Sequence, residues 1–292
     1  MAETRTVWHE SRLLQGNPLG DPHRRPIQVF VPEGQGPFPC VLALPGFTGN
    51  HYGFTNRSWR AENLVQRTER LIGQGMPPMI LVMPDVMTSM GGCQYLDTPT
   101  LGPYASWLVT ELMPWIDERL PTSGSWGVTG KSSGGYGSLM LPMQFPDRFQ
   151  ALAAHAPDAG FEYATLPDLP GAVEAVRRAG GLRAWWERFH RGGELQSGDH
   201  GILNLVAMSM CYSPEPGREP VPAELPVDLE TGETRHEVMR RWAAFDPVNR
   251  VAEAGAALGG VSIWLDCGRR DEFRLQVGAR MLHRAMEQAE IV

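Results

Sequence analysis

The chain has 292 residues, of which 42% are hydrophobic and 20% are charged, a balance typical of a globular protein with one large core. Its formal net charge of −7 argues against nucleic acid as a partner. No apolar run approaches the roughly 20 residues that cross a bilayer, and residues 1–14 do not resemble a signal peptide. We therefore expect no membrane partner and a cytoplasmic location, with a processed exported protein as the alternative.

Cysteine usage agrees with a reducing compartment. Four cysteines are widely scattered and match neither a zinc-ligand spacing nor a small disulfide framework: Cys40, Cys93, Cys211 and Cys267. No cluster of His, Asp and Glu shows ligand spacing either. We expect no metal and no cofactor.

Short apolar runs predict buried parallel strands, which we place at residues 41–44, 79–83, 126–129, 151–154 and 261–265. Helical patterns lie between or after them, at residues 104–116, from about 135, and at 172–179, 184–190 and 275–289. This alternation predicts one α/β domain over 1–292, with a mostly parallel central sheet and helices on both faces.

Residues 158–246 interrupt this rhythm. The segment is rich in Pro, Gly and charged residues and is too long for a simple loop. We interpret it as an insertion, or cap, that follows the strand after the nucleophile helix and covers one end of the sheet.

The sharpest motif is Gly-Lys-Ser-Ser-Gly at residues 130–134, which matches G-x-S-x-G. A predicted strand leads into it and a helix leads out, so Ser132 is expected at the tip of a tight strand-to-helix turn where flanking glycines allow close approach. Ser133 is a weaker candidate nucleophile, because Lys131 would then replace the first glycine. A phosphate-binding loop is excluded, because it needs Gly where Ser125 stands.

Attack by a serine on a carbonyl requires two N–H donors for the developing oxyanion. One is expected from Ser133, the residue after the nucleophile. The segment LPGFTGN follows an earlier strand, and the Phe47 N–H is the second candidate. We therefore predict an oxyanion hole formed by Phe47 and Ser133.

Three carboxylates compete for the role of the catalytic acid after the strand at 261–265, namely Asp266, Asp271 and Glu272. Asp271 is favoured, because it lies beyond a glycine turn where its side chain could reach a histidine. The alternative is a solvated carboxylate paired with a neighbouring arginine.

Two further regions are candidates for substrate binding. Gln94 and Tyr95 follow a pair of glycines in the loop GGCQY and are expected to face the pocket. Aromatic residues of the insertion either line the pocket from the other side or form a core of their own: Phe161, Tyr163, Trp185, Trp186 and Tyr212.

The chain resembles the putative-esterase family of α/β-hydrolases, which includes enterochelin-esterase-like and esterase-D-like proteins. The segments that carry the resemblance span most of the chain: LALPGFTGN, GGCQYLDT, ELMPWIDERL, GKSSGGYGSLMLPMQFPDRF, AAHAPDAGFEY, LPVDLETGE and LDCGRRDEFRLQVGARMLHRAM. The resemblance implies an α/β-hydrolase fold and hydrolysis of carboxylic esters by a Ser-His-Asp triad without a cofactor. It supports Ser132 as nucleophile and Asp271 as acid.

The resemblance also implies a general-base histidine after one more strand, in a Gly-Gly-His turn, and we expect that strand and histidine to lie beyond residue 292. His155 is expected to pack near the site and His283 to lie on a helix surface. A missing last strand would leave a sheet edge unpaired, so we expect this edge to pair with another chain, as in a homo-oligomer, or the protein to be less stable.

These observations predict a serine carboxylesterase that hydrolyses a small-molecule ester through an acyl-enzyme on Ser132. An acyltransferase of the same fold and a truncated, non-catalytic hydrolase-fold protein are the alternatives.

Overall fold

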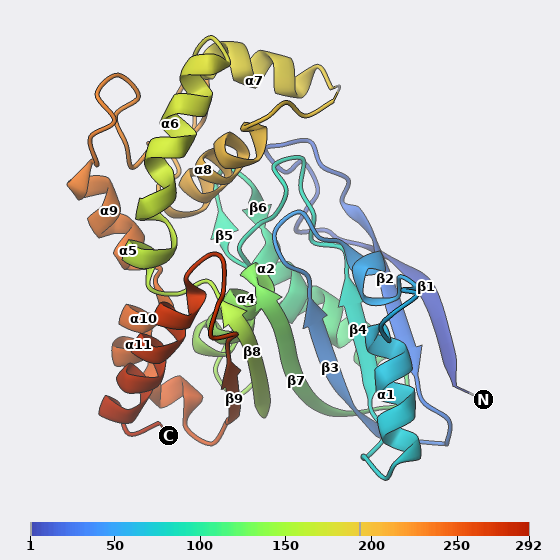
Figure 1. The fold of residues 1–292 in the computed structure, drawn as a ribbon. Coiled ribbons are helices and arrows are strands. Elements are labelled where there is room, and N and C mark those ends of the chain that lie inside the picture. The colour runs from blue at the N-terminus through green and yellow to red at the C-terminus, as the bar shows by residue number, and fades with distance from the viewer. Residues whose placement is uncertain (1, 193, 292) are drawn as a thin grey trace.

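A computed structural model describes residues 2–192 and 194–291. Its centre is a seven-stranded sheet with the order β1-β2-β4-β3-β7-β8-β9 (Figure 1). The strands are β1 (Glu3–Glu10), β2 (Arg24–Val31), β3 (Phe38–Leu44), β4 (Ile80–Pro84), β7 (Thr122–Ser132), β8 (Ala151–Pro157) and β9 (Ser262–Asp266). Two short strands, β5 (Asp97–Thr98) and β6 (Gly102–Pro103), form a separate pair.

The sheet is mostly parallel, as predicted. Strands β4, β3, β7, β8 and β9 run parallel to one another, and each corresponds to one of the five apolar runs. The antiparallel strands β1 and β2 were not predicted. The side chains of β1 are mostly exposed, so this strand lacks the apolar run that marks the buried ones.

Helices cover both faces of the sheet (Figure 1). They are α1 (Leu64–Gly73), α2 (Tyr104–Ser106), α3 (Met113–Asp117), α4 (Ser133–Gln144), α5 (Phe161–Ala164), α6 (Leu169–Arg178), α7 (Leu182–His190), α8 (Asp199–Tyr212), α9 (His236–Ala243), α10 (Pro247–Ala254) and α11 (Leu275–Gln288). Residues 133–143 of α4 are all buried, so this helix packs against the rest of the protein on every side. This packing fixes the position of the helix start at the end of β7.

The segment between β8 and β9 contains α5 to α10. In Figure 1, α6, α7 and α8 lie above the end of the sheet toward which the parallel strands point. Inside this segment, the buried Asp199 accepts hydrogen bonds from the Trp185 indole and from Arg188. We refer to residues 158–246 as the cap segment.

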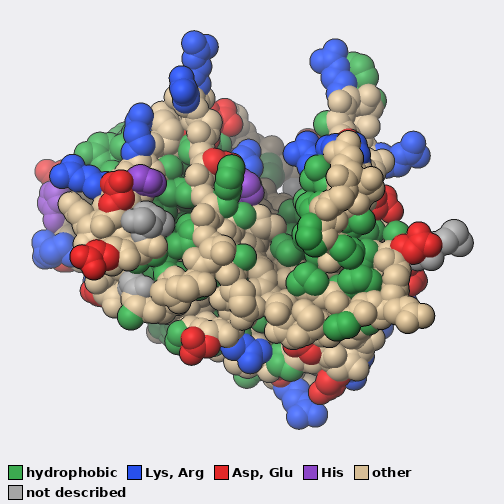
Figure 2. Space-filling model, turned by 90° about the horizontal axis from the view of Figure 1, so that it is seen from below, with side chains coloured by type: hydrophobic (Ala, Val, Ile, Leu, Met, Phe, Trp, Pro, Cys, Tyr) green, Lys and Arg blue, Asp and Glu red, His purple; other side chains and the backbone are tan. Residues whose placement is uncertain are grey.

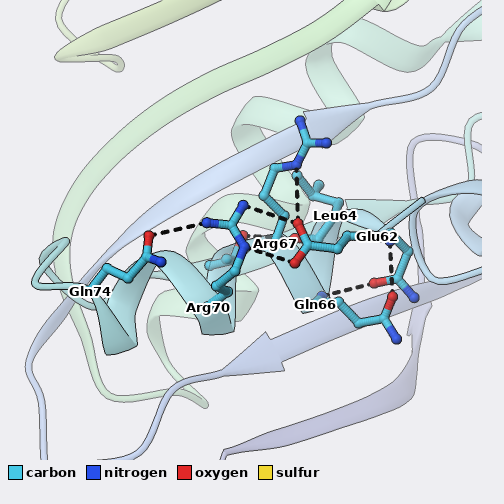
Figure 3. A network of polar contacts seen from close by, with 8 residues as sticks. Glu62, Leu64, Gln66, Arg67, Arg70 and Gln74 are labelled. Atoms are coloured by element: carbon cyan, nitrogen blue, oxygen red, sulfur yellow. Dashed lines mark hydrogen bonds and ion pairs between the residues drawn. The ribbon is translucent and has the colours of Figure 1, made fainter. Parts of the chain in front are cut away.

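Helix α1 begins with a capping box. The Asn63 side chain accepts a hydrogen bond from the Gln66 N–H at 2.8 Å, and the Gln66 side chain accepts one from the Asn63 N–H. Figure 3 shows the neighbouring polar contacts, in which Arg70 forms a two-pronged pair with Glu62. The cap fixes where the helix starts, because it satisfies two N–H groups that have no partner within the helix.

The face of the molecule opposite the cap segment carries both positive and negative charges (Figure 2). Figure 2 shows this underside, where acidic, basic and apolar side chains are interspersed. Within the described ranges, no helix is long and apolar enough to cross a membrane.

Candidate active site

The turn that presents Ser132 has the strained geometry that the motif predicts. Ser132 ends β7 and α4 starts at the next residue, and the Ser132 backbone has φ 58° and ψ −124°. A Cβ at Gly134 would lie 2.1 Å from the Leu44 carbonyl oxygen, and one at Gly130 would lie 2.4 Å from the Gly134 carbonyl carbon. Both positions therefore require glycine, because strand and helix leave no room for a side chain.

The loop after β3 packs directly against this turn. A Cβ at Gly46 would lie 3.3 Å from the Lys131 carbonyl oxygen and 3.7 Å from the Ser132 Cβ. The N–H of Ser133 is the first of α4 and has no acceptor within the helix. Across residues 2–192 and 194–291, the Phe47 N–H donates to no other group. The two predicted oxyanion donors thus flank Ser132 with uncommitted N–H groups.

Gln94 and Tyr95 occupy different environments, although they are adjacent in sequence. Both have a positive φ, 49° and 54°. The Gln94 side chain lines the cavity beside Ser132, as predicted. Tyr95 was predicted to face the pocket, but it is buried behind the loop after β3, where its hydroxyl donates to the Pro45 carbonyl. It therefore supports the loop that carries Phe47 rather than lining the main cavity.

Ser132 opens into a cavity of about 330 Å³. The sheet side contributes backbone and polar groups. The cap segment contributes apolar and aromatic side chains, among them Phe161, Met208 and Tyr212, together with polar ones such as Asn204. Of the other cap aromatics, Trp185 is fully buried in the main hydrophobic core, which continues from the sheet into the cap, and Tyr163 is 42% exposed. A separate apolar cluster lies within the cap and includes Leu169, Val173 and Leu205. The cap therefore supplies part of the cavity and also has a core of its own.

Asp158 was not predicted, yet it is the polar centre of this cavity. It follows β8, and its Oδ1 accepts a hydrogen bond from the Ser132 hydroxyl at 3.2 Å. Its Oδ2 accepts from the Ser133 hydroxyl at 2.9 Å and from the Gln94 amide at 3.2 Å. Burial raises the pKa of Asp158 and the nearby Asp271 charge adds to this effect, while the three hydrogen bonds oppose it. The sequence did hold one signal for Asp158: in the segment APDAGF, this residue directly follows the end of the strand β8.

Asp271 and Asp266 have distinct surroundings. Asp271 lies in the loop between β9 and α11, and its Oδ1 accepts from the N–H groups of Phe273 and Leu275. Asp266 instead receives the Trp264 indole N–H at 2.8 Å and pairs with His155 at 3.0 Å on an exposed part of the sheet. Asp266 is therefore paired with a histidine on the exposed part of the sheet, and the role of Asp271 as the catalytic acid stays a prediction.

Asp271 borders a second, open cavity on the other side of Lys131. Its volume is about 520 Å³, and it is lined by Lys131, His155, Asp266, Cys267, Asp271 and Glu272. Lys131 lines both cavities and so marks the boundary between the two.

In the described part of the chain, no histidine hydrogen-bonds to Ser132 or to Asp271. His200, in the first turn of α8, lines the Ser132 cavity, and its ring contacts Phe47 edge-on at 6.0 Å between centroids. His283 is exposed beside Glu287 on α11, as predicted. Sequence reasoning did not single out His200, because only the packing of the cap brings it near the turn.

Within residues 2–192 and 194–291, no group of three or more His, Cys, Asp or Glu side chains is placed to hold a metal ion. All four cysteines are free, and Cys40, Cys93 and Cys211 are buried. Burial raises the pKa of the Cys40 and Cys93 thiols to about 12. These two thiols therefore stay protonated at neutral pH.

Comparison with known proteins places these features in context. The family model described as "Putative esterase" matches residues 22–292. No curated protein sequence matches the chain.

Solved structures share the fold at low sequence identity. A ferulic acid esterase is 20% identical, with 100% of this chain and 87% of that chain covered and a TM-score of 0.59. Fluorophosphonate-binding serine hydrolase F of Staphylococcus aureus is 13% identical, with 100% and 88% covered and a TM-score of 0.58. An S-formylglutathione hydrolase of Staphylococcus aureus is 12% identical, with 100% and 89% covered and a TM-score of 0.56. The α/β-hydrolase fold is common to all of them.

Proposed function

The chain belongs to the putative esterase family of ester-hydrolysing serine hydrolases, and we propose that it is a carboxylesterase that forms an acyl-enzyme on Ser132. One observation carries the proposal. Ser132 stands at a strained turn with φ 58°, opens into a cavity, and is flanked by the loop that holds Phe47. A serine without a catalytic role has no need of this combination.

In the proposed reaction, a general base takes the proton of the Ser132 hydroxyl as its oxygen attacks the ester carbonyl carbon. The alcohol departs with that proton, and the acyl group stays on Ser132. The N–H groups of Phe47 and Ser133 stabilise the negative charge on the carbonyl oxygen, each contributing about 10²–10³ in rate by analogy with other oxyanion holes. Water then attacks the acyl-enzyme and releases the acid. Asp271 is proposed as the acid that orients the general base.

The cavity sets limits on the substrate. A volume of about 330 Å³ accommodates a small acyl group together with part of the alcohol. Its aromatic and aliphatic lining supports a partly apolar substrate. The natural partner is therefore proposed to be a small-molecule ester rather than a polymer bound over a long surface.

A fluorophosphonate probe and a short-chain p-nitrophenyl ester test the proposal, because both require an activated serine. Wild type should be labelled and should turn over the ester. Ser132→Ala should lose both, whereas Ser133→Ala should keep labelling at the same site, since its backbone N–H is retained. His200→Ala in the same assay tests whether the cap supplies the proton acceptor for Ser132.

The outcomes are distinct. Labelling that survives in Ser132→Ala would refute Ser132 as the nucleophile. Absence of labelling and turnover in the folded wild type would refute the esterase proposal. Addition of an alcohol that diverts most of the acyl group from acid to a new ester would point to an acyltransferase instead.

A further inference from the structure

The wall of the cavity beside Ser132 presents two acceptors. Lys131 also lines this cavity, but among the described residues its side chain donates to neither of them. Asp158 accepts hydrogen bonds from three neutral donors, namely two serine hydroxyls and the Gln94 amide. In the described part of the chain, no Lys, Arg or His donates to this carboxylate. The charge that acts on it from nearby is Asp271, which has the same sign. Burying this carboxylate costs free energy, and no opposite charge is paired with it to offset that cost.

Gln94 provides the second acceptor. Its side chain is 2% exposed, and its amide nitrogen is directed to Asp158 and Met208. Its Oε1 is buried and has no hydrogen-bond partner. A buried carbonyl without a donor costs free energy, so it marks a place where a bound molecule would supply one. This observation is independent of the charge on Asp158.

The distance to the nucleophile restricts where that donor sits in the substrate. A carbonyl carbon poised for attack lies about 3–3.5 Å from the serine oxygen. Asp158 Oδ1 is itself 3.2 Å from that oxygen. A group held by Asp158 must therefore be attached close to the scissile carbonyl, on the carbon α or β to it.

We infer that Asp158 and Gln94 form a recognition site for a protonated amino group on the α or β carbon of the acyl moiety, so that the preferred substrates are esters of short amino acids. The inference rests on the proposed esterase function of Ser132 and adds the substrate class. The ammonium supplies the cation that Asp158 lacks and the N–H donor that Gln94 Oε1 lacks. The aromatic lining of the cavity, including Phe161 and Tyr212, is compatible with a cation.

Two esters of nearly equal shape test the inference directly. Methyl 3-aminopropionate and methyl butyrate differ in an ammonium against a methyl group, and acid release at pH 7 gives kcat/KM for each. Wild type should favour the amino ester by about tenfold or more, and Asp158→Asn should reduce that ratio by about tenfold, as is typical when one partner of a desolvated charge pair is lost.

A matched control lies in the same cavity. Asp168 also lines it, but its carboxylate already pairs with Arg274 at 2.6 Å. Asp168→Asn should therefore keep the ratio of the two esters within about twofold, since a rim charge that is already paired contributes little to discrimination. A loss of the ratio in both variants would indicate a general effect of cavity charge and would overturn the specific role of Asp158.

Binding to a variant that cannot react separates this inference from the proposed function. Calorimetric titration of methyl 3-aminopropionate into Ser132→Ala measures affinity without catalysis. The double variant Ser132→Ala/Asp158→Asn should bind this ester about tenfold more weakly, whereas methyl butyrate should show no such loss.

The results have separate meanings. If wild type hydrolyses both esters equally, or if Asp158→Asn slows both equally, the recognition site is refuted and the esterase proposal stands. If wild type neither hydrolyses an ester nor reacts with a fluorophosphonate, the esterase proposal fails, and the calorimetric comparison still decides whether Asp158 binds an ammonium group.

Discussion

The Ser132 hydroxyl lies 3.2 Å from Oδ1 of Asp158, so the proposed nucleophile donates its hydrogen bond to a buried carboxylate. The other oxygen of the same carboxylate accepts from the Ser133 hydroxyl at 2.9 Å. Both serines of the turn are thus tied to the end of β8. This coupling joins the chemistry of the site to the stability of the fold, because the charge of Asp158 affects both.

Asp158→Asn should raise the thermal stability at neutral pH. Burial raises the pKa of Asp158 in the folded state, so the folded chain holds this proton more tightly than the unfolded chain does. The native state then loses stability as the pH rises from about 4 through the raised pKa. Asparagine carries no charge and avoids that loss. The Tm of Asp158→Asn should exceed that of wild type at pH 7, and the difference should shrink toward pH 4.

Asp199→Asn provides a control of the opposite sign. Hydrogen bonds and charge from Arg188 lower the pKa of Asp199, so its contribution to stability is present above about pH 4 and is lost as the pH falls through the lowered pKa. This variant should be less stable than wild type at pH 7, and its deficit should diminish in acid. If Asp158→Asn and Asp199→Asn changed the Tm in the same direction at pH 7, the raised pKa of Asp158 and the lowered pKa of Asp199 could not both be correct.

Gly134→Ala should severely destabilise the protein. The added Cβ would lie 2.1 Å from the Leu44 carbonyl oxygen, which belongs to the backbone of a buried strand and cannot move aside cheaply. We expect a loss of more than about 3 kcal/mol in the free energy of unfolding, or failure to fold. Urea denaturation followed by circular dichroism measures the loss.

Gly53→Ala is the matched substitution in open space, since a Cβ added at Gly53 would meet nothing within 4 Å. Its effect should stay within about 1 kcal/mol. Similar losses for the two variants would show that backbone flexibility, rather than the close approach of helix and strand, accounts for the cost at Gly134.

Asp246→Ala should detach the cap segment from the helix that follows it. The Asp246 carboxylate accepts hydrogen bonds from the N–H groups of Gly160, Phe161 and Val248 at 3.0, 2.7 and 3.0 Å, and the residue is 5% exposed. Alanine would leave these donors unpaired, which should cost about 2–4 kcal/mol. Asp246→Asn keeps one acceptor oxygen and should lose less. Hydrogen exchange should show faster exchange at residues 160–164 in the alanine variant.

Asn63→Ala should weaken α1 at its first turn. Asparagine caps the Gln66 N–H at 2.8 Å, and loss of such a cap typically costs about 1 kcal/mol. Glu62→Ala removes the neighbouring exposed pair with Arg70, which should cost less stability than the loss of the cap, because solvent screens the exposed charges. Thermal melts of the two variants compare these effects. A larger loss from Glu62→Ala would show that the pair, and not the cap, fixes the start of the helix.

The parallel part of the fold was predictable because its signals are local. Each buried strand reads as an apolar run, and the turn at Ser132 requires small residues at fixed spacing. Strand β1 escaped prediction because its side chains are mostly exposed at the edge of the sheet, so it has no such run. Strand β2 is mostly buried, but Arg24, Arg25 and Gln28 break up its apolar residues. The helix α8 was also missed, since its burial on nearly all sides removes the amphipathic period that identifies a surface helix.

The sequence alone determined Ser132, its glycine neighbours and the order of strand, turn and helix, because these depend on contacts between residues close along the chain. Only the tertiary structure decided that Asp158 and Gln94 lie beside Ser132 in one cavity. It also decided that Tyr95 lies behind the loop after β3 and that Asp266 pairs with His155. Such contacts join side chains 25 to 111 positions apart, from the ends of different strands and from the cap. No local pattern encodes that proximity, since it arises from how the sheet orders its strands and how the cap closes over them.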